Sequence, residues 1–320
     1  DSIDQGDLDM EKIPLVAVVG PTASGKTALG IQIAKRFDGE IVSADSMQVY
    51  RGMDIATAKP DLLEQDGVVH HLIDFLNPSE PFSVADYALL AHKTIADIRS
   101  RGKLPILVGG TGLYVDSVVN DIVFTEIRTD PDLRKSLYRF AEEKGNAALL
   151  KRLRDVDPDA ASRIHENNVG RIVRALEVYE LTGITMTEQQ RRSRNGPSRY
   201  RALKVGLNYK SRPLLYSRID RRVDLMMERG LLEEAKSVLS CSMQTAVQAI
   251  GYKELRPYLD GEAQLEECIA KLKQSTRHYA KRQLTWFLRD PDIQWFYPDE
   301  EEMTELIKKV FVLVEMFLEV

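Results

Sequence analysis

Residues Gly20 to Thr27 carry the spacing G-x-x-x-x-G-K-T, which is typical of a loop that binds phosphate groups. The glycines allow backbone N–H groups to turn inward around a phosphate, and a following helix start adds its positive dipole end. Lys26 would reach the terminal phosphates, and the Thr27 hydroxyl would ligate Mg²⁺. The predicted diphosphate- or nucleotide-binding residues are Gly20, Pro21, Thr22, Ala23, Ser24, Gly25, Lys26 and Thr27.

The flanking residues give this loop the context that it requires. The apolar run Leu15–Val19 predicts a buried parallel strand before the loop, and Ala28–Arg36 predicts a helix after it. The alternative, a glycine-rich turn that matches by chance, does not explain why strand, spacing and helix agree. The sequence therefore predicts a P-loop that binds a diphosphate or a triphosphate.

Two further strand ends could supply chemistry. Glu40–Ala44 predicts a short strand that ends at Asp45, and ligands lie beyond the carboxyl ends of parallel strands, so Asp45 should face the P-loop. An aspartate that caps a helix or a turn is the alternative. Pro105–Tyr114 predicts another buried strand, which passes through Gly109-Gly110-Thr111 where a P-loop ATPase has an aspartate on Mg²⁺. The missing acid argues against a nucleotide-hydrolysing motor, while the glycines would let a ligand approach the backbone and Thr111 would offer it a hydroxyl.

The order of the expected strands and helices predicts an α/β fold. This fold consists of a P-loop parallel-sheet core with helices on both faces and an all-helical insertion. Residues 13–127 and 196–320 are expected to form the catalytic core, after a disordered tail at 1–12. Residues 128–195 are expected to form the insertion, because their pattern is helical without a convincing strand. Asp130-Pro131 and Asp157-Pro158 each predict an N-cap followed by a proline at the first helical position, and Asn168 predicts another cap.

Composition limits the classes of protein that need to be considered. The chain has 320 residues, of which 43% are hydrophobic and 29% charged, as in soluble globular proteins. No apolar run is long enough to cross a bilayer, and the acidic start lacks the features of a secretory signal. Two cysteines, Cys241 and Cys268, form no disulfide framework, so a reducing compartment fits and we expect a cytoplasmic protein. We also expect a monomer.

The net charge of −5 hides two basic blocks. Residues 191–222 contain eleven Lys or Arg and one acidic residue, and residues 271–289 contain six Lys or Arg and no acidic residue. Such blocks in an acidic protein suggest a surface for a polyanion. A solvated helix face is the alternative for each block taken alone.

With these residues in place, the chain resembles the tRNA dimethylallyltransferases, also called tRNA isopentenyltransferases. The resemblance runs from Pro14 to Trp295, and only the P-loop is specific by itself; the order of all the pieces is highly specific. Ala56 departs from the family, which usually has glycine there, and so does Glu166–Asn168. The matching stretches are 20–27, 45–50, 54–60, 108–114, 163–165, 171–177, 249–252 and 277–286.

The resemblance implies transfer of a dimethylallyl group from its diphosphate to the exocyclic amine of the adenosine 3′ to a tRNA anticodon. The P-loop would then hold a diphosphate leaving group, with Mg²⁺ as cofactor and no need for a strand-end acid. Asp45 would act as general base, Lys26 and Arg222 would stabilise the diphosphate, and Thr111 would contact substrate near the reacting centre. The partners implied are the tRNA anticodon arm and dimethylallyl diphosphate, with no membrane.

The resemblance also implies residues that bind tRNA. Asp45 to Gln48 would meet the flipped base, and the others would hold the anticodon arm. The implied tRNA-binding residues are Asp45, Ser46, Met47, Gln48, Thr111, Arg134, Gly170, Arg171, Ile172, Val173, Arg174, Gln248, Ala249, Ile250, Gly251, Tyr252, Lys253, Arg277, Lys281 and Arg282.

Three other functions remain open at this point. An adenylate isopentenyltransferase would share the P-loop and Asp45 but would not need the insertion or the basic blocks. A P-loop small-molecule kinase would use Asp45 as the base toward a hydroxyl. A non-catalytic RNA-binding module would leave the P-loop without a role.

Overall fold

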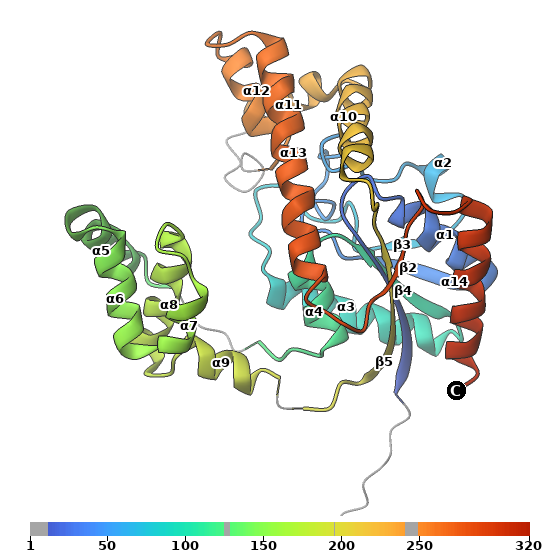
Figure 1. Ribbon diagram of the computed structural model, residues 1–320, viewed down its shortest axis with the longest axis horizontal. Helices are drawn as coiled ribbons and strands as arrows, with labels where there is room; N and C mark the ends of the chain where they lie inside the picture. The colour runs from blue at the N-terminus through green and yellow to red at the C-terminus, as the bar shows by residue number, and fades with distance from the viewer. Residues whose placement is uncertain (1–11, 125–128, 195, 241–248) are drawn as a thin grey trace, which may run out of the picture. The chain divides into compact units, whose positions relative to one another are not determined.

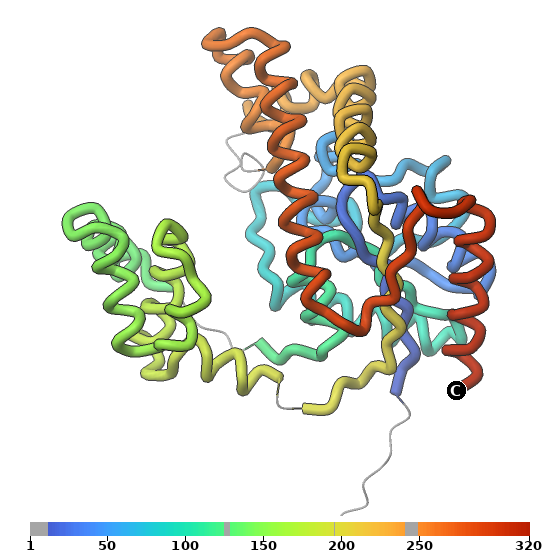
Figure 2. Tube along the Cα trace, viewed as in Figure 1, coloured from blue at the N-terminus to red at the C-terminus, as the bar shows by residue number. Residues whose placement is uncertain are grey.

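The computed structural model describes residues 12–124, 129–194, 196–240 and 249–320, and these divide into two compact units. The core unit comprises the chain up to Asn120 and from Ser198 onward, and the helical unit comprises Asp121–Pro197. The helical unit is the green to yellow-green part of the trace in Figure 2. Of the features expected from the sequence, residues 1–11 of the tail, Cys241 and Gln248 lie outside the described residues.

In the described part of the core unit, six strands form one sheet in the order β3-β2-β4-β1-β5-β6, and every pair of neighbours is parallel. Leu15 to Val19 are at most 1% exposed, so the apolar run before the P-loop is a fully buried central strand, as its composition predicts. The strands are β1 (Ile13–Val19), β2 (Gly39–Ser43), β3 (His70–His71), β4 (Leu104–Gly109), β5 (Tyr200–Leu207) and β6 (Gln294–Phe296).

Helices cover both faces of this sheet (Figure 1). On one face, α3 (Val84–Ser100) and α4 (Gly112–Val119) bury their apolar sides against β1, β2 and β4. On the other face, α1 (Lys26–Arg36) and α14 (Met303–Leu318) do the same. The predicted fold class, a P-loop parallel-sheet core with helices on both faces and an all-helical insertion, is confirmed.

A second group of helices stands beyond the sheet within the core unit (Figure 1). It consists of α10 (Arg212–Glu228), α11 (Leu231–Ser240), α12 (Tyr252–Leu259) and the first part of α13 (Leu265–Phe287). These helices share a hydrophobic cluster with Val49, Tyr50 and Met53 from the loop after β2. A short helix, α2 (Leu62–Gln65), follows in the same loop region. The helical group is thereby fixed to the residues that follow Asp45.

The described residues of the helical unit form five helices around a hydrophobic cluster of their own. Asp130 and Asp157 cap their helices through the side chain and are followed by proline, as predicted. Asn168 stands at the predicted N-cap position, but its side chain makes no capping bond, which corrects that part of the prediction. The helices are α5 (Pro131–Lys144), α6 (Asn146–Val156), α7 (Pro158–Arg163), α8 (Val169–Thr182) and α9 (Met186–Arg192).

The expected strand through Tyr114 is wrong in its second half. β4 ends at Gly109, and α4 begins at Gly112 with Thr111 in the N-cap position. The apolar residues after Thr111 belong to the buried side of this helix. Their run is too short for its periodicity to distinguish a helix from a strand. Among the described residues, no helix combines the length and the apolar character that crossing a membrane requires.

Candidate active site

The P-loop joins β1 to α1, and its backbone conformation depends on glycine at two positions. Gly20 has φ +150°, and a Cβ there would lie 2.4 Å from the carbonyl oxygen of Leu207. Gly25, the N-cap of α1, has φ +95° and lies in the left-handed region that side chains disfavour. Between them, the Ser24 hydroxyl is buried without a hydrogen-bond partner in the described structure. The loop is therefore held in a turned shape and contains a polar atom that is not satisfied by the protein.

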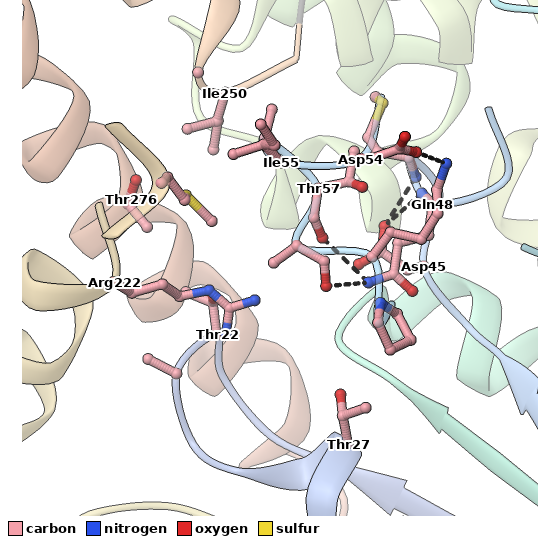
Figure 3. A pocket seen from close by; sticks show the side chains of 18 of the residues that line it. Thr22, Thr27, Asp45, Gln48, Asp54, Ile55, Thr57, Arg222, Ile250 and Thr276 are labelled. Atoms are coloured by element: carbon pink, nitrogen blue, oxygen red, sulfur yellow. Dashed lines mark hydrogen bonds and ion pairs between the residues drawn. The ribbon is translucent and has the colours of Figure 1, made fainter. Parts of the chain in front are cut away.

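A cavity of about 1030 Å³ opens beside this loop, within the core unit. It is bordered by the start of α1, the residues after β2, the loop Asp54–Asp61, and the inner sides of α10 and α13. Figure 3 shows Thr27, Asp45 and Arg222 reaching this space from three different elements. A cavity of this size is at the upper end of the range for small-molecule sites.

Two cations border this cavity. The ammonium of Lys26 donates a hydrogen bond to the carbonyl oxygen of Pro21 at 3.2 Å. Burial lowers the pKa of Lys26, the nearby Arg222 lowers it as well and Asp45 opposes them, and the resulting pKa is about 8. Burial also lowers the pKa of Arg222, whose Nε is buried without a partner in the described structure. Two desolvated cations with so few acceptors form a site where an anion would be stabilised.

Asp45 combines the two roles that the sequence left as alternatives. Its Oδ1 accepts hydrogen bonds from the backbone N–H groups of Met47 at 2.9 Å and Gln48 at 3.2 Å, as a turn aspartate does. No described residue donates a hydrogen bond to Oδ2. The same residue lines the cavity opposite Arg222, and its charge acts on both cations. One oxygen therefore fixes the carboxylate, while the other can accept a proton or a hydrogen bond from a ligand.

Gly109, the last residue of β4, and Gly110, which follows it, leave no room for a side chain. Gly109 also lines the cavity, so the approach of a ligand to this backbone stays a prediction. A Cβ on Gly109 would lie 2.2 Å from the carbonyl oxygen of Ala44, and one on Gly110 would lie 2.1 Å from Nε2 of Gln283. Thr111 does not line the cavity; its Oγ1 accepts the N–H of Ser46 at 3.1 Å. Thr111 thereby holds the turn that contains Asp45.

The loop Asp54–Asp61 is fixed to α11 by one carboxylate. Glu234 accepts the backbone N–H groups of three consecutive residues, Asp54, Ile55 and Ala56, at 2.7–2.9 Å, and the hydroxyl of Tyr252 at 2.9 Å. Ala56, where the resembling family has glycine, is not among the residues with positive φ. Its Cβ instead lies 3.1 Å from the position of a Cβ on Gly251.

The same loop orients Gln48. Nε2 of Gln48 donates to the carbonyl oxygens of Thr57 at 3.1 Å and Ala58 at 3.3 Å, drawn as dashed lines in Figure 3. Its Oε1 accepts the hydroxyl of Ser43 at 3.2 Å. Glu234 thus supports the loop, and the loop supports a residue whose own N–H is bonded to Asp45.

In the helical unit, Glu177 connects two of the arginines predicted to bind tRNA. Glu177 is 0% exposed and accepts hydrogen bonds from Arg134 at 2.9 and 3.0 Å and from Arg174 at 2.6 Å. Burial opposes its ionisation, but the hydrogen bonds from both arginines and the Asp130 amide lower its pKa overall. Gly170 and Arg171 are exposed on the same helix.

Four residues predicted to bind tRNA have side chains that are buried in hydrophobic clusters. Ile172 and Val173 lie in the core of the helical unit, and Ala249 and Tyr252 lie in the cluster of the α10–α13 group. Their side chains pack within the protein, and contact of these residues with tRNA stays a prediction. Of the other predicted residues in the core unit, Arg277 pairs with Asp220 at 2.6 Å and Lys281 is exposed. Those that line the cavity are Ser46, Met47, Gln48, Ala249, Ile250, Gly251, Lys253 and Arg282.

Four residues that build the site were not predicted from the sequence. Arg218, one helical turn before Arg222, donates to the carbonyl oxygen of Ala23 at 3.1 Å. Tyr279 lines the cavity and interacts with Thr111. Gln283 and Glu234 form hydrogen bonds with backbone groups of loops that are distant in sequence. Spacing of one turn from Arg222 could have indicated Arg218, but no local pattern indicates a side chain whose partners are backbone atoms far away in sequence.

The described residues contain no cluster of three or more His, Cys, Asp or Glu that could hold a metal ion. A divalent ion at this site would therefore depend on Thr27 and on oxygens of the substrate. This donor set fits Mg²⁺, which keeps several waters and is often bound through substrate phosphates.

Two family models match the chain, and both describe enzymes that transfer an isopentenyl group. The model for "IPP transferase" matches residues 48–290, and the model for "Isopentenyl transferase" matches residues 13–72. The class of protein defined by fold and site is thus an isopentenyl-transferring enzyme with a P-loop core.

Individual relatives identify the family within this class. The chain is 50% identical over 301 residues to a tRNA dimethylallyltransferase of Halalkalibacterium halodurans, covering 93% of this chain and 96% of that protein. A tRNA isopentenylpyrophosphate transferase of Bacillus halodurans has a similar crystal structure, with TM-score 0.73, 47% identity and coverage of 96% and 97%. A eukaryotic dimethylallyltransferase acting on tRNA gives TM-score 0.80 at 31% identity, covering 96% of this chain and 80% of that one. The chain belongs to the tRNA dimethylallyltransferase family.

Proposed function

We propose that this chain transfers a dimethylallyl group from dimethylallyl diphosphate to the exocyclic amine of the adenosine 3′-adjacent to the anticodon of tRNAs, releasing diphosphate. The observation that carries the proposal is the placement of Asp45 and the cations Lys26 and Arg222 around one cavity. Membership in the family supports the reaction class and the tRNA acceptor.

The cationic side of the cavity would act on the leaving group. As the allylic C–O bond breaks, negative charge develops on the diphosphate, and Lys26, Arg222 and the P-loop N–H groups would stabilise it. Mg²⁺, held through Thr27 and the substrate, would add charge neutralisation there. Arg218 would act on the shape of the loop, since it bonds the Ala23 carbonyl.

The acidic side would act on the nucleophile. The exocyclic amine of adenine is a weak nucleophile, because its lone pair is delocalised into the ring. Oδ2 of Asp45 would accept an N–H of that amine and take its proton as the new C–N bond forms. The adenosine must leave its stack to enter the cavity, as bases do in other enzymes that modify them. Residues Ser46, Met47 and Gln48, beside Asp45, would border the flipped base.

The tRNA would be held by basic residues that the sequence singled out. Lys253 and Arg282 border the cavity, Lys281 lies exposed close by in sequence, and Arg134 and Arg171 belong to the helical unit. Binding through phosphates should weaken steeply as salt rises. The cytoplasmic location, the monomeric state, and the assignment of residues 13–127 and 196–320 to catalysis and 128–195 to tRNA binding stay predictions.

One experiment compares the acceptors. The protein is incubated with labelled dimethylallyl diphosphate and Mg²⁺, and with unmodified tRNA, an anticodon stem-loop or AMP. Transfer of label to both RNAs, with little transfer to AMP, is expected. Transfer to AMP alone would favour an adenylate isopentenyltransferase. Release of γ-phosphate from ATP into small metabolites, without prenyl transfer, would favour a kinase.

A further inference from the structure

A buried carboxylate in the helical unit accepts hydrogen bonds from two arginines and one backbone amide of the described residues. Glu177 on α8 is 0% exposed, and its oxygens accept Nε and Nη2 of Arg134, Nη1 of Arg174 and the N–H of Asp130, the last at 2.9 Å. The two guanidinium groups come from α5 and α8, so the carboxylate brings together residues 40 positions apart in sequence.

Burial of such a group does not by itself indicate a role in stability. The desolvation of a buried ion pair offsets most of its Coulomb attraction, and apolar replacements of buried Arg–Glu–Arg clusters have proved neutral or stabilising in another protein. A carboxylate retained in this position therefore suggests a role in orientation. The nearby Arg152–Glu180 pair, by contrast, lies at the surface of the same unit.

The arginines keep donors that Glu177 does not use. Their side chains are 39% and 35% exposed, although the carboxylate between them is fully covered. Among the described residues, nothing accepts from Nη1 of Arg134 or from Nε and Nη2 of Arg174. Fixed guanidinium groups with free N–H donors match the geometry of phosphate oxygens.

We propose that Glu177 is a positioning residue for RNA, which holds Arg134 and Arg174 as a fixed pair whose outward N–H groups contact phosphates of the tRNA. The proposal rests on the proposed function, because it takes tRNA as the ligand of the helical unit. It differs from a purely electrostatic role, since Glu177 itself repels RNA.

The sign of one substitution separates these roles. If only net charge mattered, Glu177→Gln in the full chain would tighten tRNA binding. If Glu177 positions the arginines, the same variant weakens binding about tenfold, the value of one charge-assisted hydrogen bond. The slope of log K against log salt should also become shallower by roughly one to two units, because each lost phosphate contact contributes about 0.7–0.9.

Glu180→Gln is the matched control, because it removes the same charge from the same helix and breaks only the exposed pair with Arg152. This control should bind tRNA as the wild type does or slightly more tightly. Glu177→Asp keeps the charge but shortens the side chain, and it should also weaken binding. Wild-type-like or tighter binding by Glu177→Gln, with an unchanged salt slope, would overturn the proposal.

A second comparison removes the effect of altered stability. In an Arg134→Gln/Arg174→Gln background, adding Glu177→Gln should cause no further loss of tRNA affinity, since the residues through which it acts are gone. If Glu177→Gln still lowers tRNA affinity in this background, Glu177 affects binding through the stability of the fold, and the proposal is overturned. Failure of the proposed function would look different, because the wild type itself would then transfer no prenyl group to tRNA.

Discussion

The side-chain oxygen of Gln283 accepts the backbone N–H of Thr22 at 2.8 Å. On its other side, Nε2 of the same amide donates to the carbonyl oxygen of Gly110 at 3.0 Å. Gln283 is buried on α13, so this one side chain joins the P-loop to the loop that carries Thr111. The diphosphate side and the Asp45 side of the cavity are therefore mechanically connected through α13.

Removing this connection should harm catalysis more than folding. Gln283→Ala leaves the Thr22 amide and the Gly110 carbonyl without partners, at a cost of about 1–3 kcal/mol for each group that stays buried. We expect kcat/KM for the diphosphate donor to fall by at least about tenfold, as measured in steady-state transfer assays. Gln274→Ala on the same helix is the control, because the exposed Gln274 accepts a hydrogen bond from the exposed Lys271. Equal kinetics of the two variants would contradict a joining role for Gln283.

Glu234 should control the order of the loop at Asp54–Ala56. Glu234→Gln replaces an acceptor for three N–H groups by an amide whose NH₂ end faces donors. Amide hydrogen exchange at residues 54–56 should become faster, and kcat/KM for tRNA should fall about tenfold, as for the loss of a hydrogen bond to a charged group. The adjacent exposed Glu233→Gln should change neither quantity. Unchanged exchange in Glu234→Gln would refute the anchoring role.

The pKa of Lys26 predicts how donor use depends on pH. Because this pKa is lowered to about 8, with burial as the largest cause, the ammonium of the free enzyme loses its charge above that pH. The kcat/KM for dimethylallyl diphosphate should therefore decline as pH rises through about 8, since this parameter reports the free enzyme. In Lys26→Arg the decline at this pH should vanish, because arginine stays charged. A profile that is the same in both proteins would assign the decline to another group.

The same pKa has a consequence for stability. The unfolded chain keeps a proton on Lys26 up to about pH 10.5, whereas the folded protein releases it near 8. Below about pH 8 the charge is buried in the folded protein, and its full cost lowers the free energy of unfolding. This cost decreases between about pH 8 and 10.5, where the folded protein has released the proton. Lys26→Met should melt at a higher temperature than the wild type at pH 7, and the difference should shrink toward pH 10. A constant difference would contradict this linkage.

The parts of the site that depend on local pattern could be predicted from the sequence. The P-loop and the placement of Asp45 at a strand end follow from buried strands, glycine spacing and the rule that parallel strands end at one edge. The caps at Asp130 and Asp157 follow from their prolines. These features require only neighbouring residues, and the structure contains all of them.

The parts that depend on tertiary contacts could not be predicted. Gly110 excludes a side chain because Gln283 lies against it, and these residues are 173 positions apart. The resemblance places Ile172 and Val173 among the tRNA-binding residues, and only the structure shows that their helix turns both side chains into the core. The resemblance assigns a role to a whole stretch of sequence. The exposure of each side chain, however, depends on the face of the helix on which its residue lies.

The central claim, that Asp45 activates the acceptor opposite the cationic diphosphate site, is tested most directly by single-turnover transfer with Asp45→Asn. Asparagine keeps an oxygen for the N–H groups of Met47 and Gln48, so the turn is preserved while the base is lost. With tRNA and donor both bound, the transfer rate should fall by about 10²–10³, typical of one lost transition-state contact, while the Kd for tRNA changes little. A rate near that of the wild type would contradict the account.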